Sequence, residues 1–276
     1  MQIQYDENGL PIITQENYYE KEISEAYMSF HDYLGYAGHL AEGQGCEARE
    51  EAIRKGEWEE DMRTTSILVG SYVDAYFDNS LDKFKKDNPD IFTQKGELKA
   101  PYKRAEKMIA RCEKDPLFMA YMSGEKQKIF TGYMFGTHVR CKLDSYIKGK
   151  AIVDLKTTSS LHKAWRIQDQ GYVSVVEYWF YTGQLAWYRE LVRQNTGEEL
   201  PCYLAFVTNE DNPEICIVHV DDMELKNALN EIEMNMPNVL MVRNGEVEPI
   251  RCEKCDYCKA TKKLTHAISY QDLIME

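Results

Sequence analysis

The spacing of apolar positions changes along the chain and divides it into helical and extended regions. Up to about residue 122, apolar residues recur at helical spacing in residues 1–60 and in the stretches 64–90 and 98–122. We expect the first region to be an N-terminal helical cap. The second should be one helix that Asn88-Pro89 closes, and the third should open at Pro101 and break near Pro116.

From Glu125 the period becomes two, which predicts a meander of three or four short strands through residue 158. Its turns are expected near Gly132, Gly136 and Gly149. An amphipathic helix over 176–197, strands at 202–208 and 214–220, and a long helix follow. The last helix should be capped by Asp221 or Asp222 and run to about Met236.

This order of elements favours an α/β (α+β) fold with a mixed central β-sheet flanked by helices. We divide the chain into the helical cap of residues 1–60, a core of residues 61–240, and a Cys-rich tail of residues 241–276 that packs on the same domain. The length of 276 residues is sufficient for a sizeable hydrophobic core.

Charge and cysteine content narrow the functional classes. The chain has 33 Lys and Arg against 46 Asp and Glu, a net charge of −13, which argues against a general polyanion binder. Its first residues, MQIQYDENGLPIIT, lack the basic and apolar regions of a signal peptide, and no apolar run could span a membrane. We therefore expect a soluble cytoplasmic protein, whose 8 cysteines are thiols or metal ligands rather than disulfides.

The stretch AIVDLKTT at residues 151–158 places two charges inside an apolar strand. Asp154 and Lys156 share a face, because strand side chains alternate. If Lys148-Gly149-Lys150 forms a three-residue hairpin loop, Asp144 lies directly opposite Asp154, whereas a two-residue loop makes them diagonal neighbours.

Two carboxylates opposed across a sheet repel each other and need a compensating cation. Lys156 supplies one positive charge, and a hard divalent ion such as Mg²⁺ or Mn²⁺ would supply the rest. The alternative is an Asp154–Lys156 pair at a sheet edge with Asp144 in solvent.

With Gln184 and Tyr188 as Q-x-x-x-Y on the next helix, the order D, D-x-K, Q-x-x-x-Y resembles the PD-(D/E)XK nuclease superfamily. The chain looks most like the RecB-like branch and the phage RecE-type exonucleases (exodeoxyribonuclease VIII). The resemblance implies a restriction-endonuclease-like core, Asp144 and Asp154 as metal ligands, and Lys156 as the catalytic lysine. It also places Gln184 and Tyr188 at the site or on the DNA backbone.

Two further acids are candidates for the same site. RecB-like nucleases usually carry G-x-x-x-H on an upstream helix, and the matching segment here runs from Gly70 to Asp74, with an aspartate where histidine is expected. Asp74 could still be an oxygen ligand of the metal. Glu125, at the start of the meander, is a second acid, or a solvated strand end.

Cys252, Cys255 and Cys258 form C-x-x-C-x-x-C in a polar, lysine-rich tail, where core packing does not explain them. Three thiolates close together favour a metal with a fourth ligand. Several RecB-like nucleases have an iron–sulfur staple of one early and three late cysteines, and Cys46 occupies the early position. We expect a [4Fe-4S] cluster or Zn²⁺, with His266 as an alternative fourth ligand.

The other cysteines and the basic residues have less specific interpretations. Cys112, Cys141, Cys202 and Cys216 lie in regular elements and are expected in the core. Candidate DNA contacts are Lys103, Lys107 and Arg111 on one helix, the tail lysines, and Lys163 with Trp165, whose ring could stack on an unpaired base.

The resemblance implies a metal-dependent exonuclease of phage or prophage recombination that processes double-stranded DNA ends. Its implied partners are a single-strand annealing protein and further copies of itself in a ring-like homo-oligomer that retains DNA despite the net acidity. One alternative is a catalytically weak nuclease-fold module that binds DNA or protein. Another is a scaffold whose only functional site is the cysteine cluster.

Overall fold

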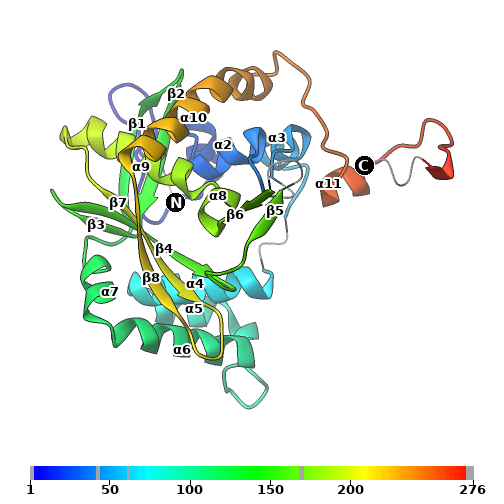
Figure 1. The fold of residues 1–276 in the computed structure, drawn as a ribbon. Helices are drawn as coiled ribbons and strands as arrows, with labels where there is room; N and C mark the ends of the chain where they lie inside the picture. The colour runs from blue at the N-terminus through cyan, green and yellow to red at the C-terminus, as the bar shows by residue number, and fades with distance from the viewer. Residues whose placement is uncertain (1–2, 42–43, 61–62, 168–170, 272–276) are drawn as a thin grey trace.

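A four-stranded sheet runs through the centre of the molecule (Figure 1). The computed structural model describes residues 3–41, 44–60, 63–167 and 171–271. The strands, in the spatial order β3-β4-β7-β8, are Ser145–Ile147, Ala151–Thr158, Cys202–Thr208 and Ile215–Val220. β4 and β7 are parallel and the other neighbours are antiparallel. The predicted mixed central sheet is confirmed.

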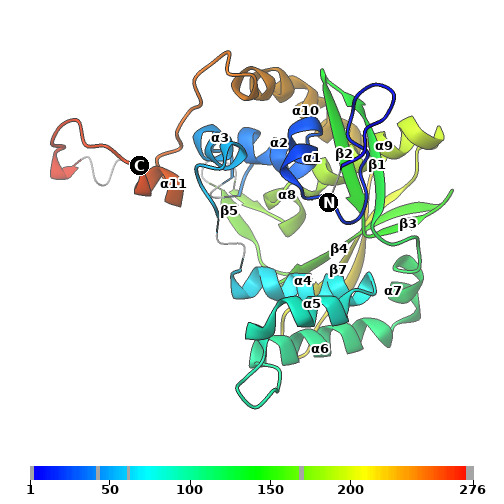
Figure 2. The same ribbon diagram turned by 180° about the vertical axis from the view of Figure 1, so that it is seen from behind.

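Helices cover both faces of this sheet (Figures 1 and 2). On one face lie α4 (Thr65–Phe77), α5 (Leu81–Asp87), the short 3-10 helix η1 (Pro89–Ile91), α6 (Ala100–Glu113) and α7 (Pro116–Tyr121). On the other face lie α2 (Phe30–Ala37), α8 (Val175–Tyr178), α9 (Tyr181–Thr196) and α10 (Asp222–Arg243). The two layers give two hydrophobic cores, one on each side of the sheet.

β4 is buried because it contributes to both cores. Ile152 packs in the core that contains α9 and α10, whereas Val153 and Leu155 pack in the core that contains α4 and α6. A strand paired on both edges and covered on both faces explains the nearly continuous apolar run of this segment. Asp154 and Lys156 interrupt the run only on the α9 face.

The predicted meander is split between two sheets. β1 (Lys128–Met134) and β2 (Thr137–Leu143) form a separate antiparallel hairpin, and the chain enters the central sheet at β3. The expected turn at Gly132 is wrong, because this residue lies inside β1. A Cβ on Gly132 would lie 2.7 Å from Cδ2 of Leu191, so glycine permits the close approach of α9.

Three predicted helices have different bounds. The expected single helix over 64–90 is two helices, because Asn79 adopts a left-handed backbone with φ 64° between α4 and α5. The helix expected over 176–197 is likewise divided at Phe180, with φ 56°. α10 continues past Met236 to Arg243, with Pro237 inside it and Asp221 in the N-cap position.

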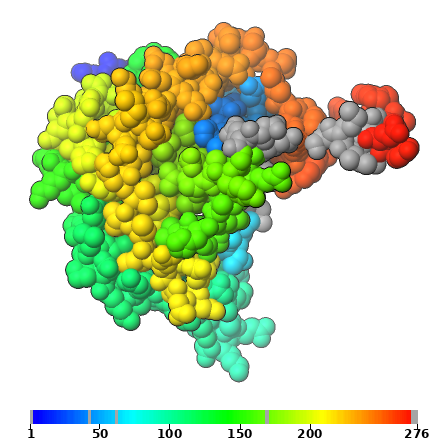
Figure 3. Space-filling model, viewed as in Figure 1, coloured from blue at the N-terminus to red at the C-terminus, as the bar shows by residue number. Residues whose placement is uncertain are grey.

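The N-terminal and C-terminal segments meet beside the core. The remaining helices and strands are α1 (Lys21–Ala26), α3 (Glu47–Lys55), β5 (Trp165–Ile167), β6 (Gly171–Val173) and α11 (Asp256–Ala260). α11 lies against α3, and the chain beyond it projects from the body (Figures 1 and 3). Within the described ranges, none of the helices has the length and apolar character needed to cross a membrane.

Candidate active site

Asp154 and Lys156 lie between β4 and α9 as a close ion pair. Asp154 is 2% exposed, and its Oδ2 atom lies 2.5 Å from Nζ of Lys156. The same Nζ lies 4.7 Å from the centre of the Tyr181 ring at the start of α9. Because β4 is an interior strand, the alternative of a pair at a sheet edge is wrong.

The hairpin places Asp144 beside this pair. Residues 148–150 form the loop, and Ser145 is opposite Val153. When this pairing is extended by one residue, Asp144 lies opposite Asp154, as the three-residue loop predicts. Asp144 lies at the bend between β2 and β3, where its Oδ2 accepts a hydrogen bond of 2.8 Å from the backbone N–H of Leu155. The alternative required Asp144 to lie free in solvent, but the residue is only partly exposed.

Asp74 reaches the site from α4 through a close contact between helix and strand. A Cβ on Gly70 would lie 3.1 Å from Oγ1 of Thr157, at the end of β4. The glycine therefore lets α4 approach the strand that carries Asp154. Asp74 follows one helical turn later and lines the same cavity.

The three carboxylates and the lysine shift one another's pKa values. Burial raises the pKa of Asp144 to about 7, and the Asp154 carboxylate adds to the effect. Burial also raises the pKa of Asp74 well above its usual range, with a further contribution from Asp144. Burial disfavours the Lys156 ammonium, but the combined attraction of Asp154, Tyr181 and Asp144 outweighs burial and raises the pKa of the lysine. Lys156 therefore stays protonated at neutral pH.

These residues fit a divalent cation. Oδ2 of Asp154 is buried and receives no well-aligned hydrogen bond from any described residue, although Lys156 lies within ion-pair distance. When ionised, Asp74, Asp144 and Asp154 carry more negative charge than Lys156 can balance. Carboxylate oxygens are the ligands that Mg²⁺ and Mn²⁺ prefer, so a divalent cation would offset this excess of negative charge.

Gln184 and Tyr188 extend the site along α9. Nε2 of Gln184 donates hydrogen bonds to Oδ1 of Asp154 at 3.3 Å and to the Tyr188 hydroxyl at 2.6 Å. The two side chains are one helical turn apart and so face the site together. Burial, followed by the nearby Asp154 charge, raises the pKa of Tyr188, which keeps its hydroxyl neutral.

All of these side chains line one cavity of about 810 Å³. Several lining residues were not anticipated. Gln127, with a left-handed φ of 51°, donates a hydrogen bond of 3.4 Å from Nε2 to Oδ1 of Asp144. Arg49 and Glu50 come from α3, and Lys142 from β2. No local motif marks these residues, because they reach the site only through tertiary packing.

Other residues that the sequence singled out as candidates lie outside the cavity or are already paired. Glu125 is exposed and pairs with Lys128 at 2.8 Å, so it is a solvated strand end. The α6 residues Lys103, Lys107 and Arg111 are not among the residues that line the cavity. Trp165 stacks on Tyr178 with ring centres 4.0 Å apart, so this face of its ring is already occupied.

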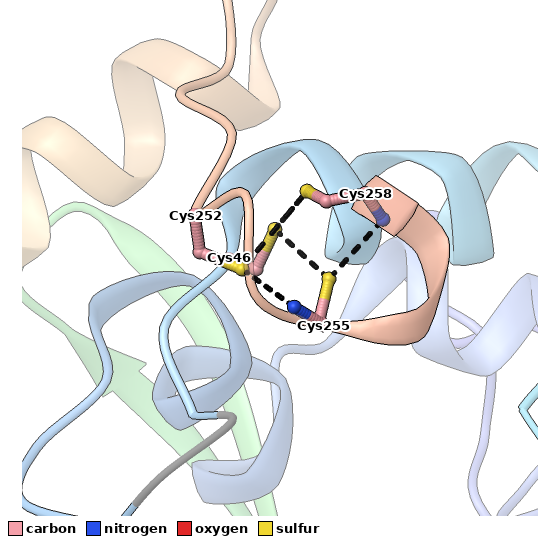
Figure 4. Close-up of side chains that lie close together, drawn as sticks. All are labelled: Cys46, Cys252, Cys255 and Cys258. Carbon is pink, nitrogen blue, oxygen red and sulfur yellow. Dashed lines mark hydrogen bonds between the residues drawn. The ribbon is translucent and has the colours of Figure 1, made fainter. Parts of the chain in front are cut away.

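The four cysteines predicted to act together do converge (Figure 4). Their Sγ atoms all lie within 4.8 Å of one another. Cys46 is the N-cap of α3, Cys252 precedes α11, and Cys255 and Cys258 belong to the start of α11. This set of thiols could hold a metal ion.

Two other predictions, one about a metal ligand and one about a core cysteine, need correction. His266 is exposed and contacts Thr265 rather than the cysteines, so its role as alternative fourth ligand is wrong. Cys216 on β8 is exposed and not in the core, whereas Cys112, Cys141 and Cys202 are buried as expected.

Comparison with known proteins agrees with this geometry. Residues 19–261 match the model of a family described as a PDDEXK-like domain of unknown function (DUF3799). A crystal structure of a "putative exonuclease" from Eubacterium rectale is 52% identical, with a TM-score of 0.91 over 95% of this chain and 98% of that one. The crystal structure of SSO0001 is 14% identical, with a TM-score of 0.33 over 80% of this chain and 96% of that one. The curated proteins include no significant match.

Proposed function

Because this chain belongs to the family of PDDEXK-like domains, we propose that it is a metal-dependent deoxyribonuclease that hydrolyses phosphodiester bonds. The observation that carries the proposal is the convergence of Asp144, Asp154 and Lys156 on one cavity of about 810 Å³. One buried acid, one half-buried acid and an ammonium form a site for a cation and a phosphate together.

Each side chain has a role that follows from its environment. Asp144 and Asp154, with Asp74, would hold Mg²⁺ or Mn²⁺. The bound cation would supply Lewis-acid chemistry, which promotes attack of water and offsets charge on the phosphate. Water adds to phosphorus and one P–O ester bond breaks, which leaves one phosphate end and one hydroxyl end.

Lys156 contributes charge rather than base catalysis. Its raised pKa keeps it an ammonium, which can stabilise the negative charge that develops on the phosphate oxygens. Gln184 positions Asp154 through its 3.3 Å hydrogen bond, and Tyr188 in turn holds Gln184. Tyr188 is a positioning residue, because it bonds to the amide of Gln184.

We further propose an exonuclease that processes double-stranded DNA ends. The 52% identical relative is described as a "putative exonuclease", which supports this choice over an endonuclease. The proposed context is phage or prophage recombination in the cytoplasm, with a single-strand annealing protein as partner and a homo-oligomer that retains the DNA.

The net charge of −13 does not exclude DNA as substrate, because the cavity wall carries its own cations. Lys142 lines the cavity with Lys156, whereas Arg140 is 3% exposed and Arg49 pairs with glutamates of the same wall. Lys142 lies 4.7 and 4.4 Å from the ring centres of Tyr18 and Tyr19, which also line it. A strand that enters the cavity would therefore meet cations and aromatic rings.

The test is digestion of linear duplex DNA and of covalently closed circular DNA, with Mg²⁺ or with EDTA. We expect loss of the linear substrate only, in Mg²⁺ only, and no cleavage by the Asp154→Asn variant. Glu125→Gln is the matched control, because Glu125 is a solvated acid outside the cavity. Equal cleavage by wild type and Asp154→Asn would refute the assignment.

A nuclease-fold module that binds DNA without cutting it is the second candidate. The close Asp154–Lys156 pair, at 2.5 Å, favours it, since a lysine held by the metal-binding acid is less available to a phosphate. The same assay distinguishes the two functions. A module of this kind would retain labelled DNA in a binding measurement and leave it intact in Mg²⁺ and in Mn²⁺.

A further inference from the structure

The spacing of the four cysteine sulfurs indicates which metal centre they form. Sγ of Cys46 lies 3.6 Å from those of Cys255 and Cys258, and Sγ of Cys252 lies 3.9 Å from that of Cys258. No pair in the group is separated by more than 4.8 Å. Each of the four sulfurs is thus close to all the others.

These distances match one tetrahedral metal ion. Zinc–thiolate bonds of about 2.3 Å at tetrahedral angles separate neighbouring sulfurs by about 3.8 Å. In a [4Fe-4S] cluster each thiolate binds a different iron, so the width of the iron cube lies between the sulfurs. Thiolates 3.6 to 3.9 Å apart leave no room for that cube. The iron–sulfur staple implied by the resemblance to RecB-like nucleases therefore does not fit these side chains.

We propose that Cys46, Cys252, Cys255 and Cys258 bind one Zn²⁺ as a closed structural site with four thiolate ligands. The backbone supports thiolates at these positions. Sγ of Cys252 accepts N–H bonds from Lys254 at 3.5 Å and from Cys255 at 3.3 Å, and Sγ of Cys255 accepts one from Cys258 at 3.5 Å. Such outer N–H donors orient zinc-bound thiolates and disperse their charge.

The zinc joins two segments that share few apolar contacts. Among the described residues, the buried hydrophobic cluster around it consists of Cys46, Ala48, Cys255 and Cys258, with Cys252 and Tyr257 packed at its edge. Few apolar contacts give little burial energy, so a metal would supply much of the stability of this junction.

The same junction positions part of the cavity wall. Cys46 begins α3, and Arg49 and Glu50 in the first turns of this helix line the cavity. Glu47 ties α3 to the tail, because its Oε2 accepts a 2.8 Å bond from the N–H of Ile250. Zinc would thus hold α3 at the edge of the candidate active site without contacting substrate.

The experiment is metal analysis and optical spectroscopy of the full-length protein, purified both in air and anaerobically. We expect one zinc per chain in both preparations, no iron, and no visible absorption. Zinc content should fall at least about tenfold in Cys46→Ser and Cys258→Ser, and stay unchanged in Cys216→Ser, whose thiol lies on β8 outside the cluster.

Wild-type protein provides a test that does not depend on the folding of variants. Replacing the metal with Co²⁺ should produce the intense visible bands of tetrahedral cobalt–thiolate. About four irons per chain with broad visible absorption in the anaerobic preparation would overturn the proposal, and so would the absence of both metals. These measurements involve no DNA, so their outcome is independent of the nuclease assignment.

Discussion

Nζ of Lys156 lies 2.5 Å from Oδ2 of Asp154, and this oxygen receives no well-aligned hydrogen bond from any residue in the described part of the chain. The ion pair is therefore the main compensation for a carboxylate that is 2% exposed. Removing one member of a buried pair leaves the other charge uncompensated, which is destabilising. Substitutions at these two positions should thus change stability as well as chemistry.

The first prediction separates these two effects. Lys156→Met should reduce cleavage by about 100- to 1000-fold, because it removes a cation that stabilises developing charge. It should also lower Tm, since Asp154 is left buried without its partner. The double variant Lys156→Met/Asp154→Asn should recover much of the Tm but none of the cleavage. Thermal unfolding and a DNA digestion assay measure the two readouts.

The control is Lys150→Met, which removes an exposed lysine from the loop of the same hairpin. It should leave both cleavage and Tm close to wild type. If the double variant regains cleavage together with Tm, Lys156 has only a structural role.

The second prediction concerns Asp74, which stands where a histidine is expected from the resemblance. Asp74→Asn should weaken divalent-cation binding, because it removes one carboxylate from the site. Asp74→His should shift the preference toward Mn²⁺ relative to Mg²⁺, since imidazole suits transition metals better than Mg²⁺. Cleavage rates titrated with each cation measure the shift. If the ratio of the cleavage rates in Mg²⁺ and in Mn²⁺ is the same in Asp74→His as in wild type, Asp74 does not contact the cation.

The third prediction is a pH dependence that follows from Asp144. Its pKa is raised from the usual 3.8 to about 7, chiefly by burial. Between these values the folded, metal-free protein holds a proton that the unfolded chain has released, so stability falls as pH rises from about 4 to about 7. A divalent cation competes with this proton, so the rise in Tm caused by Mg²⁺ should grow with pH over the same window.

Asp144→Asn is the comparison that isolates this group from the other acids. In EDTA, the Tm difference between wild type and Asp144→Asn should change steadily between about pH 4 and pH 7, with wild type relatively less stable at the higher pH. Thermal unfolding at a series of pH values measures this difference. A difference that does not vary with pH would contradict the assignment.

The hairpin that carries the site was predictable because its information is local. Lys148-Gly149-Lys150 suits a tight loop, and Gly149 adopts the left-handed φ of 69° that such a loop requires. Once the loop length is known, alternation along the strands determines that Asp144 and Asp154 meet. The cysteine cluster was equally predictable, because three thiols in a polar tail have few other uses.

The sequence predictions were wrong where tertiary packing overrides the local conformational preference of a residue. Asn79 and Phe180 end helices in left-handed conformations that no glycine marks. Gly132 resembles a turn residue, but its missing side chain accommodates α9. Gln127 and Arg49 reach the cavity from segments remote in sequence from Asp154, and no spacing rule connects them.

The fourth prediction concerns the aromatic residues beside the cavity. Trp165 is stacked on Tyr178, whereas Trp179 is 36% exposed and lines the cavity. Trp179 is therefore the ring that is available to stack on an unpaired base. Base–aromatic stacking contributes about 1–3 kcal/mol, so Trp179→Ala should weaken binding of a single-stranded overhang by about 5- to 150-fold.

A duplex with a short overhang that contains a fluorescent base analogue, bound in EDTA or Ca²⁺ to prevent cleavage, gives the measurement. The fluorescence of the analogue should be quenched by wild type and much less by Trp179→Ala. Tyr172→Ala is the matched control, because Tyr172 is 73% exposed on β6 and is not among the residues lining the cavity. An equal loss of binding in both variants would indicate a general effect of surface aromatics. Unchanged quenching in Trp179→Ala would show that the base stacks elsewhere.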